Sequence, residues 1–153
     1  MGFSARRMAW VLACAVPACL ATAATAALPM AAGAGGATIV VRNDRTAWFF
    51  GTSFGGVASF LPTPLLVDGT LAPLRNVTAI AAGYSHGAAV AGGSLYVWGF
   101  NGNGELGTGD TVSVPRPRFR SSGCAGGVVA LAAGASHMLA LCGDQTVRSW
   151  GSN

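Results

Sequence analysis

The most constraining feature of this sequence is a set of segments that recur at a fixed interval. AAGYSH is followed by YVWG in residues 81–99, and AAGASH is followed by RSWG in residues 132–151. Upstream of these, LPTPLL (61–66) corresponds to VPRPRF (114–119), and a worn third copy at 31–51 lacks the Ser-His pair. Periods of about 20–50 residues are typical of stacked architectures in which no single unit buries its own hydrophobic face.

Each unit predicts short antiparallel strands joined by tight turns. VTAIAAG, GAAVAG and SLYVWG are β-rich and separated by glycine, and in the worn copy TIVV and AWFF flank a turn at Asn43-Asp44. The chain has 52% apolar residues, 9% charged residues and 23 glycines, which suits short strands and close backbone packing rather than long helices. The expected fold class is therefore all-β.

The motifs AAGYSHGAAV, LYVWGFNGNGELGTGD, VPRPRF and VVALAAGASHMLAL resemble the repeats of the RCC1 (regulator of chromosome condensation) family. The resemblance implies antiparallel blades of a seven-bladed β-propeller, of which this chain holds about two to two and a half repeats. The repeat region is 31–153, divided into a degenerate partial repeat (31–51) and two repeats (52–99 and 100–151). A kelch propeller is the near alternative, but the Gly92-Gly93 doublet it would need has no equivalent in the final unit.

The repeated motif residues are interpreted as structural. Two adjacent strand residues point to opposite faces, so the Ser-His pairs do not form a nucleophile and base, and two histidines fall short of a zinc ligand set. We therefore expect no catalytic, metal or cofactor site and a non-enzymatic chain. The structural motif residues are Gly83, His86, Trp98, Gly99, Leu106, Gly107, Gly134, His137, Trp150 and Gly151.

One basic stripe is a candidate contact for an acidic partner. Arg116, Arg118 and Arg120 alternate, so an extended segment would present all three on one face, although a solvated strand face is the simpler reading. The positive charge elsewhere is scattered, which argues against a nucleic-acid partner. The expected partner is a protein of unknown identity.

The first 27 residues have the order of a signal peptide: a basic start, an apolar stretch and then small residues. We expect a secreted, periplasmic or otherwise extracytoplasmic protein, with membrane attachment only if this segment is kept as an anchor. In an oxidising compartment Cys124 and Cys142 could form a disulfide, because strands 128–133 and 138–142 should pair. Asn76-Val77-Thr78 is a candidate glycosylation site.

The sequence thus predicts an exported, non-enzymatic binding scaffold. Two alternatives remain: a non-functional fragment of a longer repeat protein, and a guanine-nucleotide exchange factor for a small GTPase, which the resemblance also implies. Because the last strand would be an open edge with unpaired backbone groups, we also expect self-association through blade edges.

Overall fold

The computed structural model describes residues 30–33, 35–52 and 58–152. The predicted signal peptide (1–27) lies outside the described residues. The described part contains strands and turns but no helix. Blade 1 comprises β1 (Met30–Ala32), β2 (Ala37–Val41), β3 (Ala47–Thr52) and β4 (Ala58–Pro64). Blade 2 comprises β5 (Val77–Ala82), β6 (His86–Ala91), β7 (Ser94–Gly99) and β8 (Val114–Arg120). Blade 3 comprises β9 (Val128–Ala133), β10 (His137–Cys142) and β11 (Val147–Gly151).

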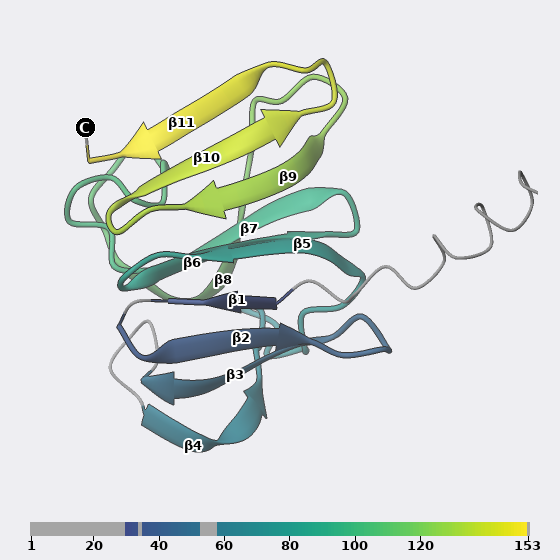
Figure 1. The fold of residues 1–153 in the computed structure, drawn as a ribbon, viewed down its shortest axis with the longest axis vertical. Helices are drawn as coiled ribbons and strands as arrows, with labels where there is room; N and C mark the ends of the chain where they lie inside the picture. Colours follow the sequence, from purple (N-terminus) through teal and green to yellow (C-terminus); the bar gives the residue numbers. More distant parts are fainter. Residues whose placement is uncertain (1–29, 34, 53–57, 153) are drawn as a thin grey trace, which may run out of the picture.

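All three sheets are antiparallel, and in each of them consecutive strands are neighbours. They stack one on another with blade 2 in the middle (Figure 1), and β5 contacts both β1 and β9. The prediction of an all-β fold with antiparallel blades is confirmed. The boundaries of the blades differ from those of the sequence repeats, because each blade begins with the strand that carries the AAG segment: β1, β5 or β9.

The burial of the second strand of each blade also indicates that blade 2 lies between blades 1 and 3. Every residue of β6 is buried, whereas burial alternates along β2 and β10. A strand that is buried on both faces lies inside a stack, and an alternating strand has one open face. The glycine and alanines of β6 are small enough to allow both neighbouring blades to approach closely.

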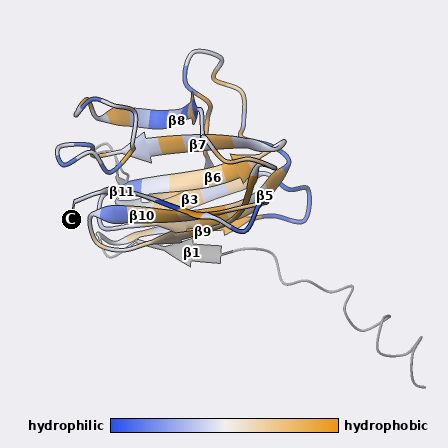
Figure 2. Ribbon diagram, turned by 90° about the horizontal axis from the view of Figure 1, so that it is seen from above, coloured by the Kyte–Doolittle hydropathy of each residue, from blue (hydrophilic) through white to orange (hydrophobic). Residues whose placement is uncertain are grey.

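Two hydrophobic clusters fill the junctions between blades. The first joins Ile39 and Val41 of blade 1 to Ile80 and Trp98 of blade 2. The second joins blade 2, through Leu106 and other side chains, to Met138 and Trp150 of blade 3. Hydrophobic residues are concentrated along the strands and hydrophilic residues in the connecting loops (Figure 2).

The glycine after the aromatic residue of each unit has a common backbone role. Gly51, Gly99 and Gly151 have φ of 98°, 104° and 103°, a region that favours glycine. A Cβ at Gly51 would overlap the Gly36 carbonyl oxygen, and one at Gly151 would overlap that of Ser136. The worn copy has therefore lost its Ser-His pair but has kept the glycine that lets β2 and β3 approach.

Blades 1 and 3 share a turn that closes their second hairpin. Asp44 Oδ1 accepts hydrogen bonds from Thr46 N (3.1 Å) and Oγ1 (2.6 Å), and Asp144 Oδ1 accepts the same pair from Thr146 (3.0 and 2.7 Å). The hydrogen bond from the threonine hydroxyl is the main cause that lowers the pKa of each aspartate from 3.8. Blade 2 instead turns through Gly92-Gly93, both with positive φ.

The structure joins Cys124 and Cys142 in a disulfide with a Cα–Cα distance of 5.1 Å. Strands β9 and β10 pair as expected, and Cys142 lies opposite Val128. The bridge ties the loop before β9 to the end of β10, across 18 positions of sequence.

Reduction of this bridge is expected to lower the free energy of unfolding by about 3 kcal/mol, because a loop of this length gains that much conformational freedom in the unfolded chain. Urea denaturation with and without reductant measures the difference. The double variant Cys124→Ala, Cys142→Ala serves as the control, since its midpoint should not respond to reductant. An unchanged midpoint for the reduced wild-type chain would contradict the prediction.

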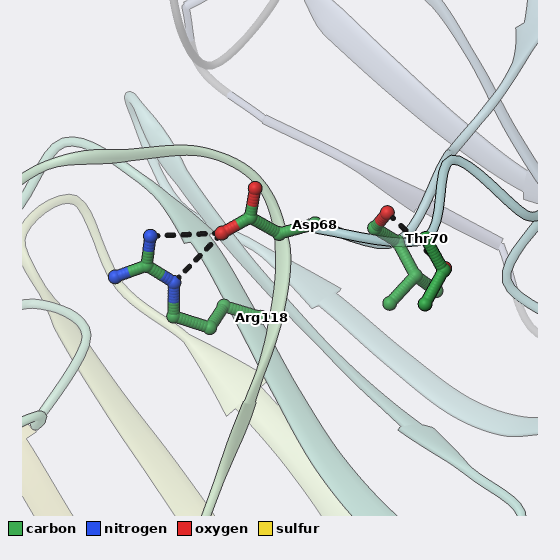
Figure 3. Close-up of polar contacts among 4 residues, drawn as sticks. Asp68, Thr70 and Arg118 are labelled. Atoms are coloured by element: carbon green, nitrogen blue, oxygen red, sulfur yellow. Dashed lines mark hydrogen bonds and ion pairs between the residues drawn. The ribbon is translucent and has the colours of Figure 1, made fainter.

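Two of the three arginines of β8 have partners on other elements. Arg118 pairs with Asp68 of the blade 1–blade 2 linker, with Nη2 and Nε at 2.8 and 2.9 Å from Oδ2 (Figure 3). Arg120 donates from Nε to the Gly107 carbonyl oxygen at 2.6 Å, and its guanidinium lies 4.3 Å from the Trp150 ring centroid. Arg118 and Arg120 lie opposite Val97 and Leu95 in regular register, and the ladder becomes irregular only between Val97 and Gly99. The role of Arg116, Arg118 and Arg120 as a contact for an acidic partner stays a prediction.

Candidate interaction site

A hollow of about 240 Å³ opens at the junction of blades 2 and 3. Three segments meet there: the β5–β6 turn, the loop that follows β7, and the β9–β10 turn. Its lining residues are Tyr84, Ser85, His86, Phe100, Asn103, Glu105, Ala135 and Ser136. Hydrogen bonds fix the three segments to one another, from Tyr84 N to the Ala135 carbonyl oxygen (3.1 Å) and from Phe100 N to the Ser85 carbonyl oxygen (2.7 Å).

His86 forms the inner wall of the hollow and is only 1% exposed. Its ring covers Gly83, where a Cβ would overlap His86 Cε1, so the spacing G-x-x-H has a steric reason. Gly134 and His137 repeat this arrangement in blade 3, but His137 is exposed. Among the described residues, His86 Nε2 has no hydrogen-bond partner.

Glu105 is the one carboxylate of the hollow, and it is 2% exposed. Its Oε2 accepts from Asn103 N (2.9 Å) and its Oε1 from Asn103 Nδ2 (2.8 Å). Burial raises the pKa of Glu105, but these hydrogen bonds lower it more, so its pKa lies below the ordinary value of 4.5. At neutral pH the hollow therefore holds a buried negative charge.

Asn101 organises the NGNGELGTGD loop that carries Glu105. The side chain is fully buried, and its Oδ1 accepts from Leu106 N at 2.8 Å. Its Nδ2 lies 3.0–3.2 Å from four acceptors, contributed by Thr108, Asp110 and Val112. The loop is thus wrapped around one amide, which our sequence reasoning did not single out.

The outer edge of the hollow is aromatic. Tyr84 is 58% exposed and Phe100 is 48% exposed. The Phe100 ring lies over Gly102, where a Cβ would collide with it. Two exposed aromatic rings beside a polar floor are typical of protein interaction surfaces, where such residues are enriched.

The predicted motif residues fall into two groups. Gly83 and His86 build the hollow, whereas Trp98 and Leu106 fill the junctions between blades. Gly107 lies against Trp150, at a point where a Cβ would come within 2.7 Å of that ring. Among the described residues, no group of three or more His, Cys, Asp or Glu side chains is placed to hold a metal ion.

Asn76, the candidate glycosylation site, is an exposed residue with φ of 56° in the turn before β5. Its carbonyl oxygen accepts a hydrogen bond from Gly92 N at 3.0 Å, which leaves the side chain outside the blade. The site remains a prediction.

The environment of His86 predicts a pH dependence of stability. Burial, the largest cause, lowers the pKa of His86 from 6.5 because it disfavours the charged imidazolium. The folded chain then takes up this proton less readily than the unfolded chain. The stabilisation is complete above pH 6.5 and is lost as the pH falls from 6.5 towards the lower pKa of the folded state.

We therefore expect the free energy of unfolding to decrease between pH 6.5 and about pH 5, above the range where carboxylates titrate. Urea denaturation at several pH values measures it, and His86→Gln should flatten the slope. NMR titration of the His86 ring provides a direct check. A His86 pKa at or above 6.5 would contradict the prediction.

The stacked antiparallel blades, each with its first strand beside the first strand of the next, define the class of protein as a β-propeller. Residues 92–141 match the model of the Regulator of chromosome condensation (RCC1) repeat. Over these residues the chain carries an RCC1-like repeat.

Curated relatives agree with this assignment. The chain is 37% identical over 95 residues to the E3 ubiquitin-protein ligase HERC2 of Homo sapiens, and 35% identical over 89 residues to the Ultraviolet-B receptor UVR8 of Arabidopsis thaliana. These matches cover 58% and 57% of this chain. They span only 2% of HERC2 and 20% of UVR8, so the chain corresponds to a small part of each relative.

Solved structures show the same fold. Human WBSCR16 superposes with a TM-score of 0.61 at 30% identity, over 74% of this chain and 30% of that chain. Prp20p from Saccharomyces cerevisiae superposes with a TM-score of 0.62 at 21% identity, over 80% of this chain and 32% of that chain. The three blades thus span about a third of each solved propeller.

Proposed function

We propose that this chain is an exported, non-enzymatic scaffold that binds another protein through the junction of blades 2 and 3. The observation that carries the proposal is the hollow itself, in which a buried carboxylate and a buried imidazole lie behind two exposed aromatic rings. A further support is that Prp20p is described by its binding properties to Gsp1p and histones. The partner proposed here is a protein rather than a nucleic acid.

Export is the second part of the proposal and rests on the sequence of residues 1–27. No helix among the described residues is long and apolar enough to cross a bilayer. N-terminal sequencing of the mature protein tests the proposal, with a start expected between Ala24 and Met30. Recovery of chains that begin at Met1 from a cytosolic fraction would contradict export. Occupancy of Asn76 by a glycan would support export in a eukaryotic host.

Two alternatives have distinct consequences. A guanine-nucleotide exchange factor would accelerate GDP release from a small GTPase, and a non-functional fragment would bind no protein with defined stoichiometry. A scaffold forms a stable complex without turnover. Size-exclusion chromatography of the full chain with captured proteins, together with a GDP-release assay, separates the three.

The matched variants for this experiment are Tyr84→Ser with Phe100→Ser at the hollow and Phe60→Ser on the outer strand of blade 1, where Phe60 is 94% exposed. The proposal requires that the first pair removes the complex and that Phe60→Ser leaves it intact. Equal loss in both variants would contradict binding at the hollow.

Self-association is a further part of the proposal. The open face of blade 1 has an apolar hollow lined by Val40, Arg42, Trp48, Phe50 and Pro62. The open face of blade 3 carries Leu139, Leu141 and Val147, which are 39%, 39% and 62% exposed. Apolar blade faces pack together at both junctions within the chain. We therefore expect the open face of blade 3 in one copy of the chain to pack against the open face of blade 1 in another copy. Light scattering tests this, and a monodisperse monomer at high concentration would contradict it.

A further inference from the structure

The hollow at the junction of blades 2 and 3 contains a charge without an ionic partner. Glu105 is 2% exposed, and the one ion pair found among the described residues joins Arg118 to Asp68. Buried carboxylates in proteins are normally paired with a cation because the loss of hydration is costly. The two hydrogen bonds from Asn103 occupy one position on each carboxylate oxygen, the backbone of Glu105 supplies a further one, and an ionised carboxylate offers about four. Glu105 therefore has unused capacity for a donor.

The other residues that line the hollow also favour a positively charged hydrogen-bond donor as the ligand. Glu105 is the only charged side chain of the lining at neutral pH, because burial lowers the pKa of His86 and leaves its ring neutral. The Nε2 atom of His86 is a second buried polar atom of this wall without a hydrogen-bond partner among the described residues. Tyr84 and Phe100 add two exposed ring faces at the rim, and aromatic faces attract cations.

The size of the hollow restricts the ligand further. Pockets that hold drug-sized molecules are usually about 300–1,000 Å³. The hollow of about 240 Å³ is smaller and open at its rim, so it suits one side chain that enters from a partner's surface.

We propose that this hollow receives a cationic side chain, arginine or lysine, from the partner protein, with Glu105 as its counter-ion and Tyr84 and Phe100 flanking its aliphatic stem. This inference rests on the proposed protein-binding function and specifies the chemistry of its contact. It assigns Glu105 as the residue that determines specificity for a positive charge.

The test uses the full chain and three capped tripeptides: acetyl-Gly-Arg-Gly-amide, acetyl-Gly-Lys-Gly-amide and acetyl-Gly-citrulline-Gly-amide. Citrulline has nearly the shape of arginine but no charge. The chain has only 2 histidines, so the ring signal of His86 is readily assigned and followed by NMR during each titration. We expect the arginine or lysine peptide to shift this signal in a saturable way, and the citrulline peptide to bind at least about tenfold more weakly.

Glu105→Gln keeps the shape of the side chain and removes its charge, so it should weaken binding of the cationic peptide about tenfold or more. Asp144→Asn removes the same charge from an exposed turn of blade 3 and should leave binding unchanged. Equal binding of arginine and citrulline peptides, or no saturable shift with any peptide, would overturn the inference. The peptide comparison on the wild-type chain decides the matter even if Glu105→Gln does not fold.

Failure of this inference and failure of the proposed function give different results. If Glu105→Gln keeps its full affinity for the partner protein while Tyr84→Ser with Phe100→Ser loses it, the scaffold function stands and the cationic side chain is excluded. If no protein binds the wild-type chain, the proposed function fails whatever the peptides do.

Discussion

Gly83→Ala is expected to lower the free energy of unfolding by about 4 kcal/mol, because the added methyl group has no space. Its Cβ would overlap His86 Cε1 and lie 2.6 Å from the Gly134 carbonyl oxygen. His86 is 1% exposed and cannot turn towards solvent, and the carbonyl oxygen belongs to the backbone of blade 3. The strain therefore has to be relieved by separating the two blades.

Gly134→Ala is the matched control in the next blade. There the three nearest atoms to the Cβ belong to the His137 ring, and His137 is exposed. That ring can swing aside, so the loss should be about 1 kcal/mol or less. Urea denaturation of both variants measures the difference. Equal losses in stability would show that burial of the histidine ring over the glycine does not matter. They would contradict the account of the blade 2–blade 3 junction.

Asn101→Ala is expected to have a comparable effect, a loss of about 4 kcal/mol. The substitution leaves the buried Leu106 N–H without its acceptor and frees the loop from the Nδ2 contacts that close it. Leu106 is fully buried between blades 2 and 3, so disorder of this loop also opens the second hydrophobic cluster.

The control for this prediction is Asn43→Ala, which changes an exposed turn residue of blade 1 and should cost about 0.5 kcal/mol or less. Thermal unfolding followed by circular dichroism provides the measurement. Asn101→Asp tests the mechanism, because it keeps an acceptor for Leu106 N but turns a buried carboxylate oxygen towards acceptors that include the Asp110 carboxylate, and a loss at least as large as that of Asn101→Ala is expected. A loss below 1 kcal/mol for Asn101→Ala would contradict the central role of this amide.

Much of the fold was predictable because its signals are local and repeated. Strands β5, β6 and β7 correspond to VTAIAAG, GAAVAG and SLYVWG, and the turn glycines between them are visible in the sequence. The pairing of β9 with β10 followed from the short turn between them. The Ser-His pairs were treated as adjacent strand residues, whereas Ser85 and Ser136 lie in the turns and only the histidines begin β6 and β10.

The site was less predictable because it is made by contacts between units. Glu105 is the single glutamate of the sequence, so a search for repeated residues does not select it. Asn101 recurs in the sequence as Asn153, but the repeat does not reveal that Asn101 is buried, which depends on how the loop after β7 folds back. The partners of the arginine stripe were not visible in the sequence for a related reason. Asp68 and Trp150, the partners of Arg118 and Arg120, come from other elements, which a strand alternation argument does not include.

The measurement that tests the central claim most directly is site-specific photo-cross-linking of the full chain. The residue p-benzoylphenylalanine is placed at Tyr84, on the rim of the hollow, or at Phe60, on the outer strand of blade 1, and the chain is irradiated in its native compartment. A scaffold that binds through the junction of blades 2 and 3 predicts one discrete protein adduct from position 84 that is absent from position 60. Adducts that are identical at both positions, or that contain only copies of the chain itself at position 84, would contradict the account.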